Sequence, residues 1–420
     1  MYNNVGNMSD STFQEDGSGQ EPTRVSHYLW VILPLITGAN LAQSLMRQGL
    51  PVLYPFIQDE FGLSRAQIGL ITSALAIGFM AAVLVAGWLT DTFGVKRISI
   101  IALLVLTAFT LAFPLVYSFS ILLALAVLIS IVDAPIHPAT TRAVMDWFPD
   151  RIRALAMGIK QMGVPLAGAL VAAVLPALAL AIGWRMAAAA TGLLVLAIAI
   201  AFILLYREAP RGIQVAHKFN LAALKPIFQN RGLMTTMAWS ATFVGFQFIV
   251  LSYFMLFAIE ELGFSPVMAG GLLAITQVIS IIARVLWGAI SDFFFHGRRM
   301  AILVIIGFMT VLWMLGASFI STGVPGIAIY LIAIIIGISN MSFHGVLITL
   351  VGEQAESGQV GMTVGVASTL NHVSQMAVPF LFGYLVDISS SYSLVWRITA
   401  VVALVMTLVL WTFGREQQRH

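Results

Sequence analysis

The sequence predicts an all-α membrane protein with twelve transmembrane helices, and three observations support this fold class. Hydrophobic residues make up 60% of the 420-residue chain and charged residues only 9%, whereas about a quarter of the residues in a soluble domain are charged. The mean hydropathy is +0.96. Apolar runs such as 98–116, 186–206 and 398–411 approach or reach the roughly 20 residues that a helix needs to cross a bilayer. We therefore expect the lipid bilayer to surround most of the chain.

The chain begins with a polar segment, residues 1–27, that is rich in Ser, Gly, Asp and Glu. It lacks the short apolar block and small-residue cleavage site of a signal peptide, so we expect a disordered cytoplasmic tail. Twelve spans follow by the hydropathy criterion, at 28–57, 65–90, 97–116, 119–146, 153–182, 185–206, 232–259, 266–291, 300–320, 325–351, 360–387 and 393–414.

Arginine and lysine residues gather on one side of this layout. They include Lys96 and Arg97, several residues of a linker at 207–231 and the tail at 415–420, whereas the opposite loops hold acidic residues such as Asp59 and few cations. Basic loops stay in the cytoplasm. The pattern therefore predicts that both termini and the linker are cytoplasmic, in a multi-pass protein of the plasma membrane (the inner membrane of a bacterium).

The linker separates two halves of six spans, 28–206 and 232–414, and short motifs repeat between these halves. The motif Gly87-Trp-Leu-Thr-Asp91-Thr-Phe-Gly94-Val-Lys96-Arg97 follows the second span, and Gly288-Ala-Ile-Ser-Asp292 and Gly297-Arg298-Arg299 follow the eighth. Trp184-Arg185 opens the sixth span, as Trp396-Arg397 opens the twelfth. Two pseudo-symmetric six-helix bundles are the simplest arrangement that accounts for these repeats.

The sequence offers no catalytic constellation. It contains no cysteine, which excludes disulfides, thiolate metal sites and cysteine nucleophiles. Phosphate-binding Gly-x-x-x-x-Gly-Lys-Ser/Thr, metalloprotease His-Glu-x-x-His and hydrolase Gly-x-Ser-x-Gly motifs are also missing. We therefore expect neither an enzyme nor an ATP-driven pump. We also expect no cofactor, no bound metal and no nucleic-acid partner, and a monomer in the bilayer.

The repeated motifs that begin at Gly87 and Gly288 resemble those of the major facilitator superfamily. The resemblance runs from the first span to the last. Within that superfamily, Arg47-Gln48, Asp133-Ala-Pro135-Ile-His-Pro138 and Trp147-Phe-Pro149 look like the anion:cation symporter group, although Met46 stands where that group often has a carboxylate. The stretch 158–168 is similar to cyanate and nitroimidazole permease relatives. The resemblance implies that the protein couples an organic anion to protons or sodium.

A cytoplasmic gate is the function we expect for the repeated motif. Glycine suits a tight turn and close helix contact, and Asp91 can accept hydrogen bonds from cations or from a neighbouring helix N-terminus. In the alternative interpretation, Lys96 and Arg97 only set the topology. The predicted gate residues are Gly87, Asp91, Gly94, Lys96, Arg97, Arg284, Gly288, Asp292 and Arg298.

Arg47 is the predicted substrate anchor. An ionisable side chain inside a membrane costs about 2.5 to 3.5 kcal/mol on insertion scales, so one that persists usually faces a cavity, a partner or a substrate. A planar guanidinium is suited to bidentate capture of a carboxylate or sulfonate. The alternative is a permanent salt bridge between Arg47 and Asp133.

Asp133 and His137 are the predicted proton-coupling pair. They are four residues apart, so a continuous helix places them on one face. Burial disfavours a charged carboxylate and a nearby arginine favours it, so alternating exposure can switch the protonation of Asp133. Alternatively, Asp133 only caps a helix break at Pro135 and Pro138.

The other predicted substrate-binding residues lie in both halves. Lys160 adds a second cation beside Gln161, although its stem is long enough for its ammonium group to snorkel to the cytoplasmic interface. Polar residues of the second half complete the set. In the alternative interpretation, the histidines among them only hydrogen-bond to backbone carbonyls and do not touch the substrate. The full predicted set is Arg47, Lys160, Gln161, Tyr253, Asn340, His344, Asn371, His372 and Gln375.

The sequence therefore favours proton-coupled uptake of a small organic anion, such as a carboxylate or sulfonate, by alternating access. The alternative is a proton-antiport exporter of drugs or metabolites, which predicts more acidic than basic residues in the cavity. A sensor or scaffold built on a transporter fold predicts loss of the gate motif or an added soluble domain, and the sequence has neither.

Overall fold

The computed structural model describes residues 28–208, 224–320, 327–355 and 360–414. The expected disordered tail at 1–27, most of the linker and the tail at 415–420 lie outside these residues. The first half contains α1 (Leu29–Phe61), α2 (Arg65–Phe93), α3 (Val95–Leu111), α4 (Phe119–Asp133), α5 (Ile136–Trp147), α6 (Asp150–Gln161), α7 (Gly163–Ile182) and α8 (Trp184–Leu205). A short 3-10 helix, η1 (Phe113–Leu115), precedes α4.

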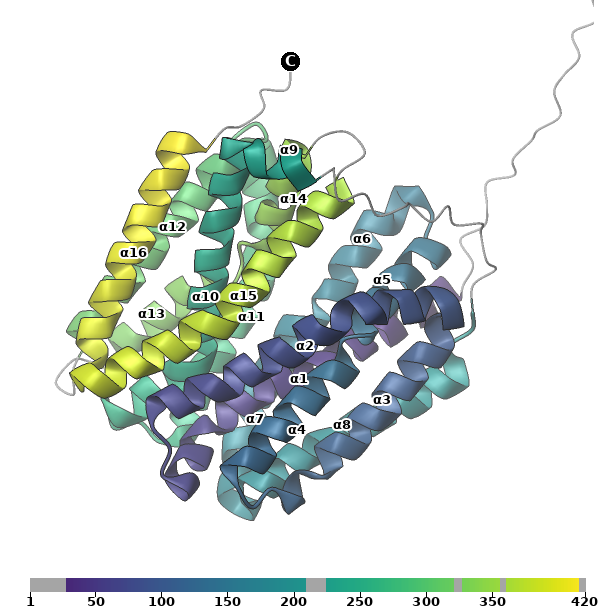
Figure 1. Cartoon of the computed structure of the whole chain (residues 1–420), viewed down its shortest axis with the longest axis horizontal. Helices are drawn as coiled ribbons and strands as arrows, with labels where there is room; N and C mark the ends of the chain where they lie inside the picture. The colour runs from purple at the N-terminus through teal and green to yellow at the C-terminus, as the bar shows by residue number, and fades with distance from the viewer. Residues whose placement is uncertain (1–27, 209–223, 321–326, 356–359, 415–420) are drawn as a thin grey trace, which may run out of the picture.

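The second half follows the short linker helix α9 (Leu224–Gln229). It contains α10 (Arg231–Glu260), α11 (Pro266–Phe293), α12 (Arg299–Phe319), α13 (Ile327–Ile338), α14 (His344–Gln354), α15 (Val360–Ser389) and α16 (Tyr392–Phe413). Figure 1 shows α1–α8 gathered on one side and α10–α16 on the other. No strand occurs in the described ranges, so the all-α prediction is confirmed.

Three of the predicted spans are each built from two consecutive helices. α4 and α5 are separated at Ala134 and Pro135, α6 and α7 at Met162, and α13 and α14 at residues 339–343. Pro135 and Pro138 explain the first break, because their rings remove backbone donors that a continuous helix would use. With each pair joined, and α9 set apart, the helices form the twelve predicted passes. By length and composition, nine segments of the described chain are suited to crossing a membrane.

The two ends of the bundle differ in their connections. We call the end with the Gly94 loop and the 207–231 linker the linker end, and the opposite end, with the turns at Gly62, Gly263 and Ser390, the hairpin end. Serine side chains cap several helices that begin at the hairpin end. The Ser64 side chain, for example, accepts a hydrogen bond from the backbone of Gln67, whose side chain bonds back to Ser64.

The two halves meet mainly through α2 with α15 and α7 with α11. Glycines allow these helices to approach closely near the hairpin end. A Cβ atom at Gly69 would lie 2.6 Å from the Phe380 Cα, and one at Gly270 would lie 2.6 Å from the Ala172 carbonyl oxygen. Toward the linker end, Gly87 has no such neighbour within 4 Å. The halves are therefore packed together at the hairpin end and are not packed around Gly87.

Candidate functional site

A cavity of about 400 Å³ lies between the two halves, within the usual range of small-molecule sites. Its walls come from α1, α2 and α5–α7 on one side and from α10, α11, α14 and α15 on the other. Its polar and charged lining residues are Asn40, Gln43, Ser44, Arg47, Gln48, His137, Gln161, Gln247, Gln277, Arg284, His344, Ser368, Asn371, His372 and Gln375. Two arginines therefore face a cavity whose described lining contains no Asp, Glu or Lys.

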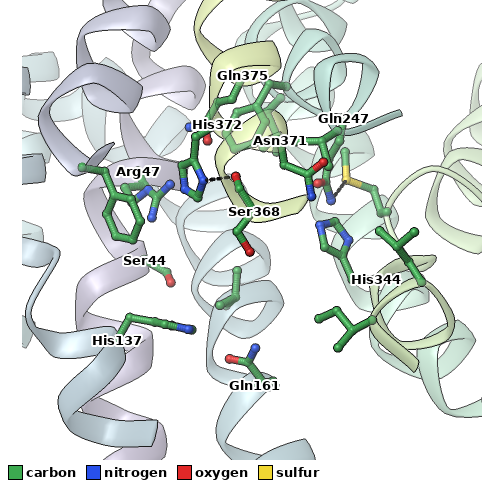
Figure 2. A pocket seen from close by; sticks show the side chains of 18 of the residues that line it. Ser44, Arg47, His137, Gln161, Gln247, His344, Ser368, Asn371, His372 and Gln375 are labelled. Carbon is green, nitrogen blue, oxygen red and sulfur yellow. Dashed lines mark hydrogen bonds between the residues drawn. The ribbon is translucent and has the colours of Figure 1, made fainter. Parts of the chain in front are cut away.

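Arg47 projects from α1 into this cavity, as predicted for the substrate anchor (Figure 2). Its guanidinium carbon lies 4.4 Å from the centroid of the Phe79 ring, a cation–π contact. The Phe79 ring in turn stacks on His372, with centroids 5.0 Å apart. Within the described chain no carboxylate lies within salt-bridge distance of Arg47. The structure therefore does not contain the alternative Arg47–Asp133 salt bridge.

The opposite wall carries Gln247, His344 and Asn371 (Figure 2). Arg284 also faces the cavity here, whereas we expected it at the gate. Its Nη2 atom donates to the carbonyl oxygen of Met341 at 3.0 Å, and its buried Nε atom has no hydrogen-bond partner. Arg284 and the gate residue Asp292 belong to the same helix, α11, but Arg284 lines the cavity whereas Asp292 does not.

Asp133 lies behind the cavity wall. It is fully buried, and neither of its carboxylate oxygens has a hydrogen-bond partner. Its backbone carbonyl oxygen accepts a hydrogen bond from Gln43 Nε2 at 3.0 Å, and Gln43 also lines the cavity. Gln43 therefore connects the backbone of Asp133 with the cavity, whereas the Asp133 carboxylate lies off the cavity lining.

The expected pairing of Asp133 and His137 on one helix face is wrong. α4 ends at Asp133 and α5 begins at Ile136, so the two residues belong to different helices. The break turns His137 onto the cavity lining and leaves Asp133 off it. Pro135 and Pro138 are the physical reason, since the helix cannot continue unchanged through them.

Gln161, Gln375, Asn371, His372 and His344 line the cavity, as expected for substrate-binding residues. The other three residues predicted to bind the substrate, Lys160, Asn340 and Tyr253, do not line the cavity. The Lys160 ammonium is buried and donates to Thr141 Oγ1 at 2.7 Å, Asn340 donates to the Phe243 carbonyl at 3.2 Å, and Tyr253 donates to the Arg65 carbonyl at 2.7 Å. Each of these side chains braces a helix contact outside the cavity.

The residues of the repeated motif form contacts inside each half. Asp91 pairs with Arg142 of α5, and Asp292 pairs with Arg299 at 2.6 Å. Gly94 and Gly297 have positive φ values of 85° and 80°, which suit the turns they occupy. Lys96 takes part through its backbone N–H, which donates to Glu208 at 3.0 Å. The Arg97 and Arg298 side chains are exposed, and Gly288, like Gly87, has open space around its Cα.

The ion pairs that join the two halves lie at the hairpin end in the described part of the chain. Arg65 of α2 pairs with Glu260 of α10 at 2.7 Å and lies 3.7 Å from Asp387 of α15. The Asp387 carboxylate also accepts the backbone N–H groups of Arg65 and Ala66, at 3.0 and 2.8 Å. These contacts close the hairpin end of the cavity.

Sequence reasoning missed several lining residues, of which Phe79 is the most important. A phenylalanine within an apolar span carries no sequence signal that separates a cavity wall from ordinary packing. Ser44 and Ser368 were missed for a related reason, since serine is common in membrane helices and often bonds only to its own backbone. Ser44 was identifiable in principle, because it precedes Arg47 by about one helical turn.

Together, the fold and the cavity define a membrane transporter built from two helical bundles. The family model described as Major Facilitator Superfamily matches residues 36–374. The chain belongs to the major facilitator superfamily. The predicted superfamily and fold are therefore confirmed, and its relatives are transporters rather than enzymes.

Similar proteins include several bacterial transporters. The chain is 24% identical to a hexuronate transporter of Bacillus subtilis, over 90% of this chain and 92% of that one. It is 24% identical to a probable sulfoacetate transporter of Cupriavidus necator, over 85% and 87% of the two chains. It is 22% identical to a probable galactarate/D-glucarate transporter of Escherichia coli, over 95% and 96%.

Solved structures share the fold at lower identity. A bacterial homologue of the human lysosomal transporter Spinster, in an inward-facing and unoccupied conformation, has a TM-score of 0.76 and 18% identity, over 94% of this chain and 100% of that one. A D-xylose-proton symporter has a TM-score of 0.75 and 18% identity, over 93% and 98%. At this identity the likeness concerns the fold alone.

Proposed function

We propose that the protein takes up a small organic anion, such as a carboxylate or sulfonate, by proton-coupled symport. The observation that carries this proposal is the unpaired Arg47 side chain in a cavity whose described lining contains no acidic residue. A cation in such a site lacks a counter-ion, and an anionic substrate supplies one. The names of the relatives, which concern hexuronate, sulfoacetate and glucarate, point to the same substrate class.

Asp133 is the proposed proton carrier. An ionised carboxylate buried without a partner is costly, and protonation removes that cost. When the cavity changes its exposure, Asp133 gains or loses access to Arg47 and water, so its proton can be exchanged. Gln43 provides a link to the substrate site, because its side chain donates a hydrogen bond to the backbone carbonyl of Asp133 and it lies one helical turn from Arg47. A sodium ion in place of the proton is the alternative coupling partner.

The proposed topology places the linker end in the cytoplasm, following the distribution of basic residues. The two bundles, 28–206 and 232–414, then rock about the cavity in a bacterial inner membrane. With the hairpin end closed by Arg65, Glu260 and Asp387, this conformation faces the cytoplasm. We propose that the protein functions as a monomer surrounded by lipid.

A thermal-shift screen tests the proposed substrate class. Purified protein in detergent is heated with carboxylates, sulfonates and cationic drugs, and a ligand of the folded state raises the melting temperature. We expect anions to stabilise the wild type and not Arg47→Ala. The matched control is Arg397→Ala, since Arg397 is exposed and contacts the Phe319 ring outside the cavity. Stabilisation by cationic or neutral amphiphiles alone would replace the proposal with drug export.

A further inference from the structure

The second arginine of the cavity, Arg284, faces the cavity although the sequence predicted it at the gate, and its position indicates another role. Resting on the function proposed above, we propose that Arg284 is a second anion anchor and that the substrate is a dianion. Such a substrate would carry one acidic group for Arg47 and another for Arg284, so it would span the two halves of the protein.

Arg284 has the features of an unoccupied anion site. It lies on α11 and lines the cavity. Its Nη2 atom donates a hydrogen bond to a neutral group, the backbone carbonyl of Met341, and its buried Nε atom has no hydrogen-bond partner. No carboxylate lies within salt-bridge distance of Arg284 in the described ranges. A guanidinium with unused donors is matched in geometry to a carboxylate or sulfonate.

The two arginines belong to opposite walls. Arg47 lies on α1 beside Phe79 and His372. Arg284 donates a hydrogen bond to the backbone carbonyl of Met341, and the Met341 sulfur atom lies 3.5 Å from Gln247 Nε2. Figure 2 shows Gln247 across the cavity from Arg47. A ligand with acidic groups at its two ends is therefore complementary in charge to the two walls.

Electrostatics favour two negative charges over one. A monoanion bound at Arg47 would leave Arg284 facing the cavity without a counter-ion, and a partly buried, unpaired charge is costly. A dianion compensates both cations. Gln247, His344 and Asn371 then lie on the Arg284 side to bind hydroxyl or carbonyl groups of the ligand. The predicted class is a short dicarboxylate or sulfocarboxylate, hydroxylated or plain.

Matched ligand pairs test this inference. Each pair replaces one acidic group with a terminal hydroxymethyl group: glucarate with gluconate, succinate with 4-hydroxybutanoate, and sulfoacetate with 2-hydroxyethanesulfonate. Dissociation constants are measured by titration calorimetry on the full-length protein in lipid nanodiscs. The variants are Arg284→Gln, the charge-retaining Arg284→Lys, Arg47→Gln, and the exposed control Arg397→Gln.

We expect the wild type and Arg397→Gln to prefer the dianion of at least one pair on the order of 10- to 100-fold, the usual effect of one charge-assisted contact. Arg284→Gln should lose this preference and keep its monoanion affinity, Arg284→Lys should retain part of the preference, and Arg47→Gln should weaken both ligands.

A wild type without preference, or an Arg284→Gln protein with the wild-type preference, would overturn the second anchor and leave anion transport standing. If Arg284→Gln does not fold, the test rests on two other measurements. These are the ratio of monoanion to dianion dissociation constants in the wild type and the same ratio in Arg284→Lys. A wild type that binds no member of any pair would overturn the proposed function as well.

Discussion

The substitution Asp387→Asn should weaken closure of the hairpin end. The Asp387 carboxylate accepts two backbone N–H groups at the first turn of α2, from Arg65 at 3.0 Å and Ala66 at 2.8 Å, and it lies 3.7 Å from Arg65 Nη1. These contacts join α15 of one half to α2 of the other. They are lost when the halves separate at this end, so they stabilise only the conformation described above.

The magnitude follows from the type of contact. A hydrogen bond to a charged group contributes about 1.5 to 3 kcal/mol, and a negative charge at a helix N-terminus adds about 0.3 to 1 kcal/mol. The Asp387 side chain is 24% exposed, so water compensates for part of this lost free energy. The side-chain oxygen of Asn also still accepts one hydrogen bond. We therefore expect a loss of about 1.5 kcal/mol, which shifts the equilibrium about tenfold toward the state open at the hairpin end.

Spin-label distances provide the assay, because the chain contains no cysteine that would be labelled by accident. Tyr117→Cys and Phe319→Cys place labels on the two halves at the hairpin end, where these side chains are 72% and 70% exposed. Double electron–electron resonance should show a longer-distance population that grows in Asp387→Asn. Asp59→Asn, an exposed carboxylate at the same end, is the matched control. Identical distance distributions for Asp387→Asn and the wild type would refute this reasoning.

Three further predictions concern coupling, packing and the cavity wall. Asp133→Asn should still bind the anion but lose pH-driven accumulation in proteoliposomes, and full accumulation by this variant would remove Asp133 from the proton path. Gly383→Ala should open the hairpin end in the spin-label assay, because its methyl group would collide with the Arg65 carbonyl and the Tyr253 hydroxyl, whereas Gly271→Ala, which has open space, should not. Phe79→Leu should weaken anion binding about 2- to 30-fold, since a cation–π contact contributes about 0.5 to 2 kcal/mol; unchanged calorimetric affinity would contradict a role in holding Arg47.

Hydropathy and charge along the chain were sufficient to predict the fold. Each span is a local property, because about 20 apolar residues must cross the bilayer whatever else the chain does. The repeated Gly87 and Gly288 motifs added the two-half arrangement. Arg47 was also predictable, since a cation in the middle of an apolar span is too costly to persist without a purpose.

The side on which each polar residue lies could not be predicted in the same way. Asp133 and His137 have helical spacing, yet the break at Pro135 separates them. Lys160 is adjacent to the cavity residue Gln161, but its ammonium group donates to Thr141 outside the cavity. A helix turns about 100° per residue, so a break or a small rotation moves a side chain from a cavity to a helix interface.

The sequence by itself therefore determined that this protein is a twelve-pass transporter of the major facilitator superfamily with a cation, Arg47, in the middle of its first span. Only the tertiary structure decided that Arg284 faces the same cavity, that Phe79 holds Arg47, and that the hairpin end is closed. The physical reason is one of range. Membrane insertion is governed by the composition of one span, whereas a binding site requires residues from distant spans to meet, as α1 and α11 do here.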